Sequence, residues 1–428
     1  MMRCEWCKFI FGILVIILSV GYISYQFIDP APPRTIKIAT GKADGAYYKY
    51  ATIYHNILQK EKFDLQIIPT AGSIEALKML RNNEVDVAFV QSGTASNSDI
   101  KELKSLGSLY FEPLWIFYNQ KNPFKYLFDL KGKNLYIGES GSGTKALTEA
   151  ILKENGINDK NTNFKPKNNP VEELKNGNIT AFFSVISASS TKIKNILLNE
   201  DIKLLDLKRA KAYAKRFNYL SALELDEGML DLKNNIPKNK ISLIGTTATL
   251  VANKHLHPDI VRLLLKTAKK VHSKESIFSK QNQFPTYKFT QIPMDENAKN
   301  YLLKGDSFLE KIFPFWIAST IDRLIIMIIP ILTLLFPLIK GALPLYRWRI
   351  RSKIYKWYKI LHELDHRIDT VSKDELRVIL KEIEKMQKTI KEDSNIPLSY
   401  MGEYYDLRVH LDLIYSRIQE RLREPLSD

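Results

Sequence analysis

Glycine and hydroxyl residues cluster in loops that follow predicted strands, and these loops have the chemistry to bind a small polar solute. The loop from Thr40 to Tyr48 joins a predicted strand over Ile36–Thr40 to a helix that begins at Ala46. Free backbone N–H groups in a first helical turn, with the positive end of the helix dipole, can hold a carboxylate or phosphate. An ordinary strand-to-helix turn is the alternative for this loop alone.

Three more loops of this kind follow other strands. Their shared position at strand ends indicates one site more strongly than any single sequence does, because ligands of open α/β sheets collect there. Ser73 is predicted to be the N-cap of its helix. The loops are Thr70–Ser73 after a strand at 65–69, Gln91–Thr94 after a strand at 85–90, and Gly138–Thr144 after a strand at 134–137.

The candidate ligand-binding residues come from these four loops. Backbone amides and hydroxyls would recognise an acid, and the tyrosines and glutamine would shape the rest of the site. A core or rim position is the alternative for each tyrosine. The candidates are Thr40, Gly41, Gly45, Ala46, Tyr47, Tyr48, Gly72, Ser73, Gln91, Ser92, Ser140, Gly141, Ser142, Gly143 and Thr144.

Catalytic motifs in the chain are incomplete, so we predict no catalytic residue, no cofactor and no resident metal. The segment Gly138–Thr144 reverses the lysine and hydroxyl of a P-loop and lacks the second glycine of a nucleophile elbow. His362-Glu-Leu-Asp-His366 matches a zinc-protease pattern, with Glu384 as a conceivable third ligand. A solvated helix face is the simpler reading, and a zinc hydrolase remains a remote alternative.

Two apolar segments suggest membrane anchoring of this 428-residue chain. Residues 9–28 carry no charge and are long enough to cross a bilayer, and residues 324–345 form a second span that Pro330 and Pro337 would kink. Basic residues follow the second segment at once and predict a cytoplasmic location for both termini, residues 1–8 included. The chain has a net charge of +16, but its sequence contains no nucleic-acid-binding motif, so no nucleic-acid partner is expected.

Strand-like and helix-like segments alternate between these spans and predict an α/β fold. We expect a two-lobed domain over residues 34–304, with lobe 1 at 34–118 and 240–304 and lobe 2 at 119–239. Strands at 114–118, 179–185 and 241–251 and a helix at 144–155 complete the coarse assignment. A juxtamembrane segment at 305–323 would follow.

Residues 347–428 are predicted to form a cytoplasmic helical tail. Apolar residues recur every three or four positions, and Ser372-Lys-Asp-Glu375 is a capping box that should begin a helix. Residues at this spacing form an apolar face along each helix, and these faces must be buried against each other or against a partner. Self-association of the tail is therefore possible, and signalling or scaffolding is the alternative role.

The outer block resembles the TAXI family of TRAP-transporter solute receptors. The residues that carry the resemblance are Ala39-Thr-Gly-(x3)-Gly-Ala-Tyr-Tyr48, Thr70–Ser73, Val87–Ser92, Gly138–Thr144 and Thr180-Ala-Phe-Phe183. The resemblance implies a type II periplasmic binding-protein fold that closes on a small, usually carboxylate-bearing solute, and it adds Phe183 to the candidate site.

Two departures from that family modify the expectation. Tethering at both ends would stop the receptor from diffusing, so capture beside a membrane permease of TRAP type, or sensing through the spans, is expected. Between Arg81 and Arg209 the chain has no arginine to clamp a carboxylate. We therefore expect an inner-membrane receptor with a periplasmic binding domain, in which Ser73, Ser140, Ser142, Thr144 and loop amides hold the acid.

Overall fold

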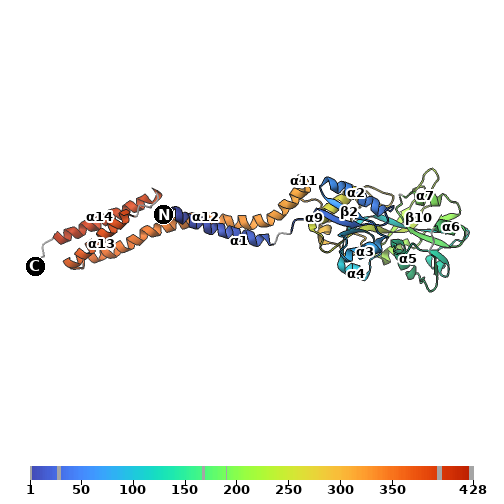
Figure 1. The fold of residues 1–428 in the computed structure, drawn as a ribbon, viewed down its shortest axis with the longest axis horizontal. Coiled ribbons are helices and arrows are strands. Elements are labelled where there is room, and N and C mark those ends of the chain that lie inside the picture. Colours follow the sequence, from blue (N-terminus) through green and yellow to red (C-terminus); the bar gives the residue numbers. More distant parts are fainter. Residues whose placement is uncertain (1, 27–29, 166–168, 189, 393–397, 424–428) are drawn as a thin grey trace. The chain divides into compact units, whose positions relative to one another are not determined.

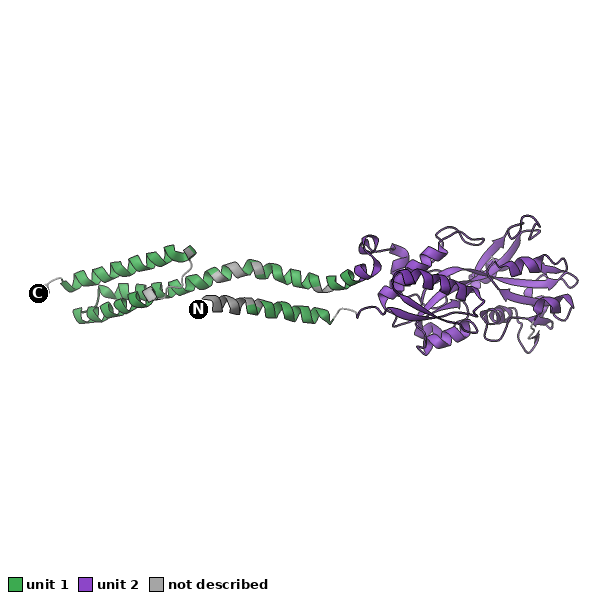
Figure 2. Ribbon diagram, turned by 45° about the horizontal axis from the view of Figure 1, so that its top comes forward, with its two compact units in different colours: residues 1–29, 320–428 green, residues 30–319 purple. Residues whose placement is uncertain are grey.

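The computed structural model describes residues 2–26, 30–165, 169–188, 190–392 and 398–423. The chain divides into two compact units, Pro30–Ser319 and a second made of Met1–Asp29 with Thr320–Asp428 (Figure 2). Each unit has hydrophobic cores of its own. The units are therefore described separately.

The unit at residues 30–319 is an α/β unit, which confirms the predicted class. Its described residues form one sheet of ten strands in the order β2-β1-β3-β10-β4-β7-β5-β6, with β8 beside β4 and β9 beside β10. The strands are β1 Thr35–Ala39, β2 Asp64–Ile68, β3 Val87–Gln91, β4 Leu103–Asn119, β5 Asn134–Tyr136, β6 Asn163–Phe164, β7 Ala181–Val185, β8 Ile202–Leu204, β9 Ser221–Leu225 and β10 Ile241–Asn253.

Helices cover both faces of this sheet (Figure 1). The helices of this unit and its C-terminal continuation are α2 Ala46–Lys60, α3 Ser73–Arg81, α4 Asn97–Glu102, α5 Gly143–Glu154, α6 Pro170–Lys175, α7 Thr191–Leu197, α8 Ala210–Arg216, α9 Pro258–His272, α10 Glu296–Lys304, α11 Phe308–Ile312 and α12 Phe315–Ile368. Short 3-10 turns lie at Leu127–Leu130 and Leu398–Tyr400.

Two lobes share the sheet. In lobe 1, β1 pairs in parallel with β2 and β3, and alternate strand residues face α2, α9 and α10 on one side and α3 on the other. In lobe 2, β5 pairs in parallel with β6 and β7, between α5 and α8 on one face and α6 and α7 on the other. The period-two alternation of apolar residues gives each strand two buried faces.

Strands β4 and β10 join the lobes. They pair antiparallel along most of their length, from Ile244 opposite Leu114 to Asn253 opposite Leu103. The sequence predicted a strand only at 114–118, whereas β4 begins at Leu103. Its first half contains Gly107 and ends at Pro113, which hide the strand pattern in the sequence.

The second unit is helical. It contains α1 Met2–Tyr25, most of α12, α13 Lys373–Glu392 and α14 Met401–Arg423, and the last three bury a shared apolar core. The capping box is confirmed, because the Glu375 carboxylate accepts from the Ser372 N–H at 3.1 Å as α13 begins. Helix α12 runs from Phe315 to Ile368 and so crosses the predicted start of the tail at 347.

The predicted membrane spans are not supported as single helices. Among the described residues, no one helix is long and apolar enough to cross a bilayer. A pair of segments, Phe315–Ile325 and Ile328–Leu338, meets the length and composition requirement together but is bent by 45°. Three prolines lie inside α12, at 330, 337 and 344. The first predicted span, 9–28, extends beyond the described residues at its end.

Candidate functional site

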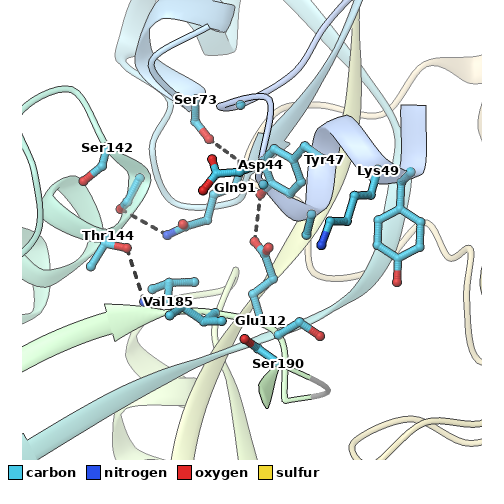
Figure 3. Close-up of a pocket in the computed structure, with 18 of the residues that line it drawn as sticks. Asp44, Tyr47, Lys49, Ser73, Gln91, Glu112, Ser142, Thr144, Val185 and Ser190 are labelled. Carbon is cyan, nitrogen blue, oxygen red and sulfur yellow. Dashed lines mark hydrogen bonds between the residues drawn. The ribbon is translucent and has the colours of Figure 1, made fainter. Parts of the chain in front are cut away.

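A cleft of about 740 Å³ lies where the loops of lobe 1 face those of lobe 2 (Figure 3). Three of the loops predicted from the sequence contribute to its wall through Gly45, Ser73 and Thr144, and β3 contributes its last residue, Gln91. These residues follow the carboxyl ends of β1, β2, β5 and β3. The structure therefore brings together chain segments separated by about a hundred residues, as the strand-end argument predicted.

Helix N-termini supply the polar wall of the cleft in lobe 1. Helix α2 begins at Ala46 after Gly45, which offers no side-chain cap, and α3 begins at Ser73 after Gly72. The N–H groups of both first turns have no partner within their own helix. Gly72 has φ +153°, and a Cβ there would approach the Gly141 carbonyl of lobe 2 to 3.2 Å.

The prediction that Ser73 caps α3 is wrong. Gly72 occupies the N-cap, and Ser73 is the first residue of the helix. The Ser73 hydroxyl instead accepts a 2.9 Å hydrogen bond from the Gln91 N–H. Ser73 thus ties the start of α3 to the end of β3 at the base of the cleft.

Contacts between the lobes cross the same edge of the cleft. The Gln91 side-chain amide donates to the Gly143 carbonyl at 3.1 Å, and Lys42 forms a 2.5 Å ion pair with Glu139. A Cβ at Gly143 would lie 2.6 Å from the Gln91 side-chain oxygen, so a larger residue there would displace the Gln91 side chain. Ser142 caps α5 by accepting from the Lys145 N–H.

The cleft contains a buried acid that the sequence analysis missed. Glu112 on β4 is only 6% exposed and accepts a 2.8 Å hydrogen bond from the Tyr47 hydroxyl (Figure 3). Burial disfavours the charged form and raises the pKa of Glu112 to about 7, although the Tyr47 hydrogen bond opposes that rise. The same burial raises the pKa of Tyr47 well above its ordinary value.

Ten predicted residues line the cleft. They share a position in a loop after a strand or in the first turn of the following helix, apart from Gln91, which ends its strand. They are Gly41, Gly45, Ala46, Tyr47, Gly72, Ser73, Gln91, Ser142, Gly143 and Thr144.

The other six predicted residues do not line it. Thr40 is fully buried, Ser92 donates to the Phe289 carbonyl at 3.1 Å, and Phe183 packs in the core of lobe 2. Ser140 and Gly141 are exposed on the loop before α5, and Tyr48 is partly buried on α2 outside the lining. Proximity in sequence to a lining residue was not enough, because neighbouring side chains point to different sides.

Sequence reasoning missed eleven lining residues. Lys49, Tyr50 and Ile53 could have been found from the helical spacing of α2, whose face toward the cleft continues beyond the loop, and Asp44 lies within the loop itself. Ser187 and its neighbours follow β7 and fit the strand-end rule that was applied to the other loops. The missed residues are Asp44, Lys49, Tyr50, Ile53, Glu112, Val185, Ile186, Ser187, Ser190, Thr191 and Lys192.

The His-Glu-x-x-His pattern gains no support as a metal site. His362 and His366 lie on α12 with ring centroids 4.4 Å apart. Within the part of the chain that the structure describes, no group of three or more His, Cys, Asp or Glu residues is arranged to hold a metal ion. His362 instead borders a smaller cavity with Tyr358 and His410 of the helical tail.

Comparison with known proteins finds one matching family model and many structures of related shape. The model of the NMT1-like family matches residues 38–271 of this chain. That range contains every residue that lines the cleft and all the parallel strands of both lobes except the first residues of β1.

Solved structures align to slightly more than half of the chain. The periplasmic aliphatic sulphonate binding protein SsuA from Escherichia coli is 14% identical, with 56% of this chain and 69% of that protein covered and a TM-score of 0.37. The amino acid ABC transporter substrate-binding protein AbpA from Streptococcus pneumoniae, bound to L-arginine, is 15% identical, with coverages of 55% and 88% and a TM-score of 0.35. An ancestral arginine-binding protein bound to arginine is 14% identical, with coverages of 56% and 92% and a TM-score of 0.37.

Proposed function

This chain belongs to the NMT1-like family, and we propose that it is a membrane-anchored receptor that captures a small organic acid or amino acid for uptake. It is a solute-binding protein and not an enzyme. The observation that carries the proposal is the cleft between the lobes, where loop amides and hydroxyls from four strand ends meet. A cleft of about 740 Å³ matches the size of pockets that enclose small molecules.

The finer parts of the proposal concern the membrane. The binding domain faces the periplasm, α12 returns the chain to the cytoplasm, and a TRAP-type or related permease receives the solute. The apolar composition of Phe315–Leu338 and the basic residues that follow, including Arg347 and Arg349, motivate this placement.

A ligand screen on residues 30–319 tests the receptor function. We expect at least one carboxylate or amino acid to raise the melting temperature, because a ligand at 100 times its Kd adds about 2.7 kcal/mol, or roughly 5 °C for a domain of this size. The fragment includes Phe315 and Trp316, which pack into the core of lobe 1. A screen without any shift, together with no small molecule released on denaturation, would contradict the proposal.

Two serines of one loop provide the matched control. Ser142 lines the cleft, whereas Ser140 is exposed outside it. Ser142→Ala should reduce the ligand-induced shift measured against its own ligand-free melting temperature. Ser140→Ala should leave that shift unchanged, and equal effects of the two substitutions would place the ligand elsewhere.

A sensing or scaffolding role is the second candidate, and one observation favours it. Helix α12 extends from Phe315 to Ile368, with a 45° bend between Phe315–Ile325 and Ile328–Leu338. Its last part packs with α13 and α14 around a core that includes Leu364, Ile383 and Leu411. A helix that begins in the binding unit and ends among packed tail helices suits transmission of a ligand signal to a cytoplasmic partner. The tail deletion discussed below separates this role from uptake.

A further inference from the structure

Glu112 is the buried charge in the wall of the cleft. It lies on β4, directly opposite Thr246 of β10, and faces the first turn of α2, where Tyr47 donates to it. Within the described part of the chain, no Lys, Arg or His lies within the 4.0 Å ion-pairing distance of this carboxyl. A carboxyl that is 94% buried without a cation is costly, and protein sites usually neutralise such a group.

The groups around Glu112 do not supply the missing positive charge. From α2 it faces Tyr47 and Tyr50, and from β4 it interacts with Tyr110. The ring of His272 of α9 stacks on Tyr110 at 5.4 Å, but burial lowers its pKa to about 3, so it is neutral. The charged residues of the cleft lining, Asp44, Lys49 and Lys192, are exposed to solvent.

Two ligand chemistries could satisfy this carboxyl. A protonated amine would pair with the ionised form, and an acceptor oxygen would bind the protonated form. The hydrogen bond from the Tyr47 hydroxyl favours the amine, because a donated proton stabilises the ionised carboxylate, which is the form that pairs with an ammonium. The helix N-termini at Ala46, Ser73 and Gly143 already provide the place for an anion in the same cleft.

We infer that Glu112, held by Tyr47, is the subsite for a protonated amino group, so the solute carries both an ammonium and an acidic group. This inference rests on the proposed receptor function and narrows its solute class from organic acids and amino acids to amino acids alone. The ammonium lies at Glu112, and the carboxylate lies at the loop amides. Glu112 is thereby the residue that distinguishes an amino acid from the same acid without its amino group.

The test compares matched pairs of compounds on the full-length chain by calorimetry. The pairs are L-alanine with propionate, L-leucine with 4-methylpentanoate, and L-glutamate with glutarate. We expect an amino acid to bind at least tenfold more tightly than its partner acid. Glu112→Gln should weaken the amino acid by roughly 30-fold or more, because it removes one member of a buried charge pair, and should leave the partner acid unchanged. Glu102→Gln, an exposed glutamate on α4, is the control for folding and charge.

The pH dependence gives an independent readout of the same subsite. The amine stays protonated between pH 6 and 8, while Glu112 gains a proton as pH falls through about 7. Apparent affinity for the amino acid should therefore fall about tenfold from pH 8 to pH 6, and Glu112→Gln should abolish that dependence.

Each outcome decides between the two levels of the proposal. Partner acids that bind as tightly as the amino acids, or a Glu112→Gln variant with unchanged amino acid affinity, would overturn the amine subsite and leave the receptor function standing. Affinity that rises toward pH 6 would assign Glu112 to an acceptor oxygen instead. No binding of any of the six compounds would overturn the amine subsite for these solutes, and failure of the wider screen as well would overturn the receptor function.

Discussion

Glu112 makes the binding unit less stable at neutral pH than an uncharged side chain would. Its pKa is about 7 in the folded state against about 4.5 in the unfolded chain. The unfolded state therefore loses its proton first, and the free energy of unfolding falls as pH rises from about 4.5 to about 7. This difference between the two pKa values lowers the free energy of unfolding by roughly 3 kcal/mol, and the full loss is reached above pH 7.

Glu112→Gln should remove this penalty. In urea unfolding of residues 30–319, we expect the variant to match the wild type near pH 4.5 and to exceed its free energy of unfolding by up to about 3 kcal/mol at pH 8. Parallel pH profiles for the two proteins would show that Glu112 is not the group responsible. Ligand must be absent, because a bound amine would stabilise the ionised carboxyl.

The residue types in the sequence were enough to predict the loops of the site, but they did not reveal its buried acid, Glu112. Glycine and hydroxyl residues that follow an apolar segment mark the end of a strand, so Gly41, Gly72 and Ser142 could be predicted from their neighbours in the sequence. Glu112 stands between Phe111 and Pro113 in the middle of a strand, where nothing local distinguishes it. Its role depends on the approach of α2 and Tyr47, which is a tertiary contact.

At the scale of elements, the start of α12 belongs to the binding unit. Phe315 is buried in the core of lobe 1, and the Trp316 indole N–H donates to the Glu61 carbonyl at 2.6 Å. Arg34 lies over the Trp316 ring at 5.0 Å. The sequence analysis predicted a domain that ends at 304 and a juxtamembrane segment at 305–323, whereas Phe315 and Trp316 of that segment pack on the core of lobe 1.

Phe315→Ala should therefore destabilise the binding unit. Removal of a buried phenylalanine side chain costs about 3 to 5 kcal/mol of unfolding free energy. Phe308→Ala is the matched control, since Phe308 is 74% exposed on α11 and its loss should cost less than about 0.5 kcal/mol. Urea unfolding of residues 30–319 measures both, and equal effects would mean that Phe315 does not belong to this core.

The long elements were the least predictable from the sequence. Pattern rules recovered the short parallel strands of lobe 1 and the first residue of α2, where local periodicity and glycine agree. Strand β4 and helix α12 extend through glycine and proline residues that normally end an element. In β4, pairing with β10 along both lobes compensates for Gly107 and Pro113, and this pairing partner lies more than a hundred residues away.

At the scale of the whole molecule, binding and tail reside in separate compact units. The cleft lining lies entirely within residues 30–319, and the core of the tail involves residues from Ile354 to Ile418. Solute affinity should therefore not depend on the tail. The tail matters for function only if the chain passes on a signal or assembles with a cytoplasmic partner.

Deletion of Lys353–Asp428 separates uptake from signalling. If the chain serves a permease, uptake of the solute identified in the screen should persist in cells that carry the deletion, and the Kd of the purified protein should be unchanged. Two point substitutions make the same test without shortening the tail. Leu411→Asp disrupts the core of the tail, whereas Val409→Asp changes an exposed residue on the same helix. The membrane levels of all variants are compared first. At equal levels, a loss of uptake with the deletion and with Leu411→Asp, but not with Val409→Asp, would contradict a passive tail. That result would favour the sensor or scaffold role.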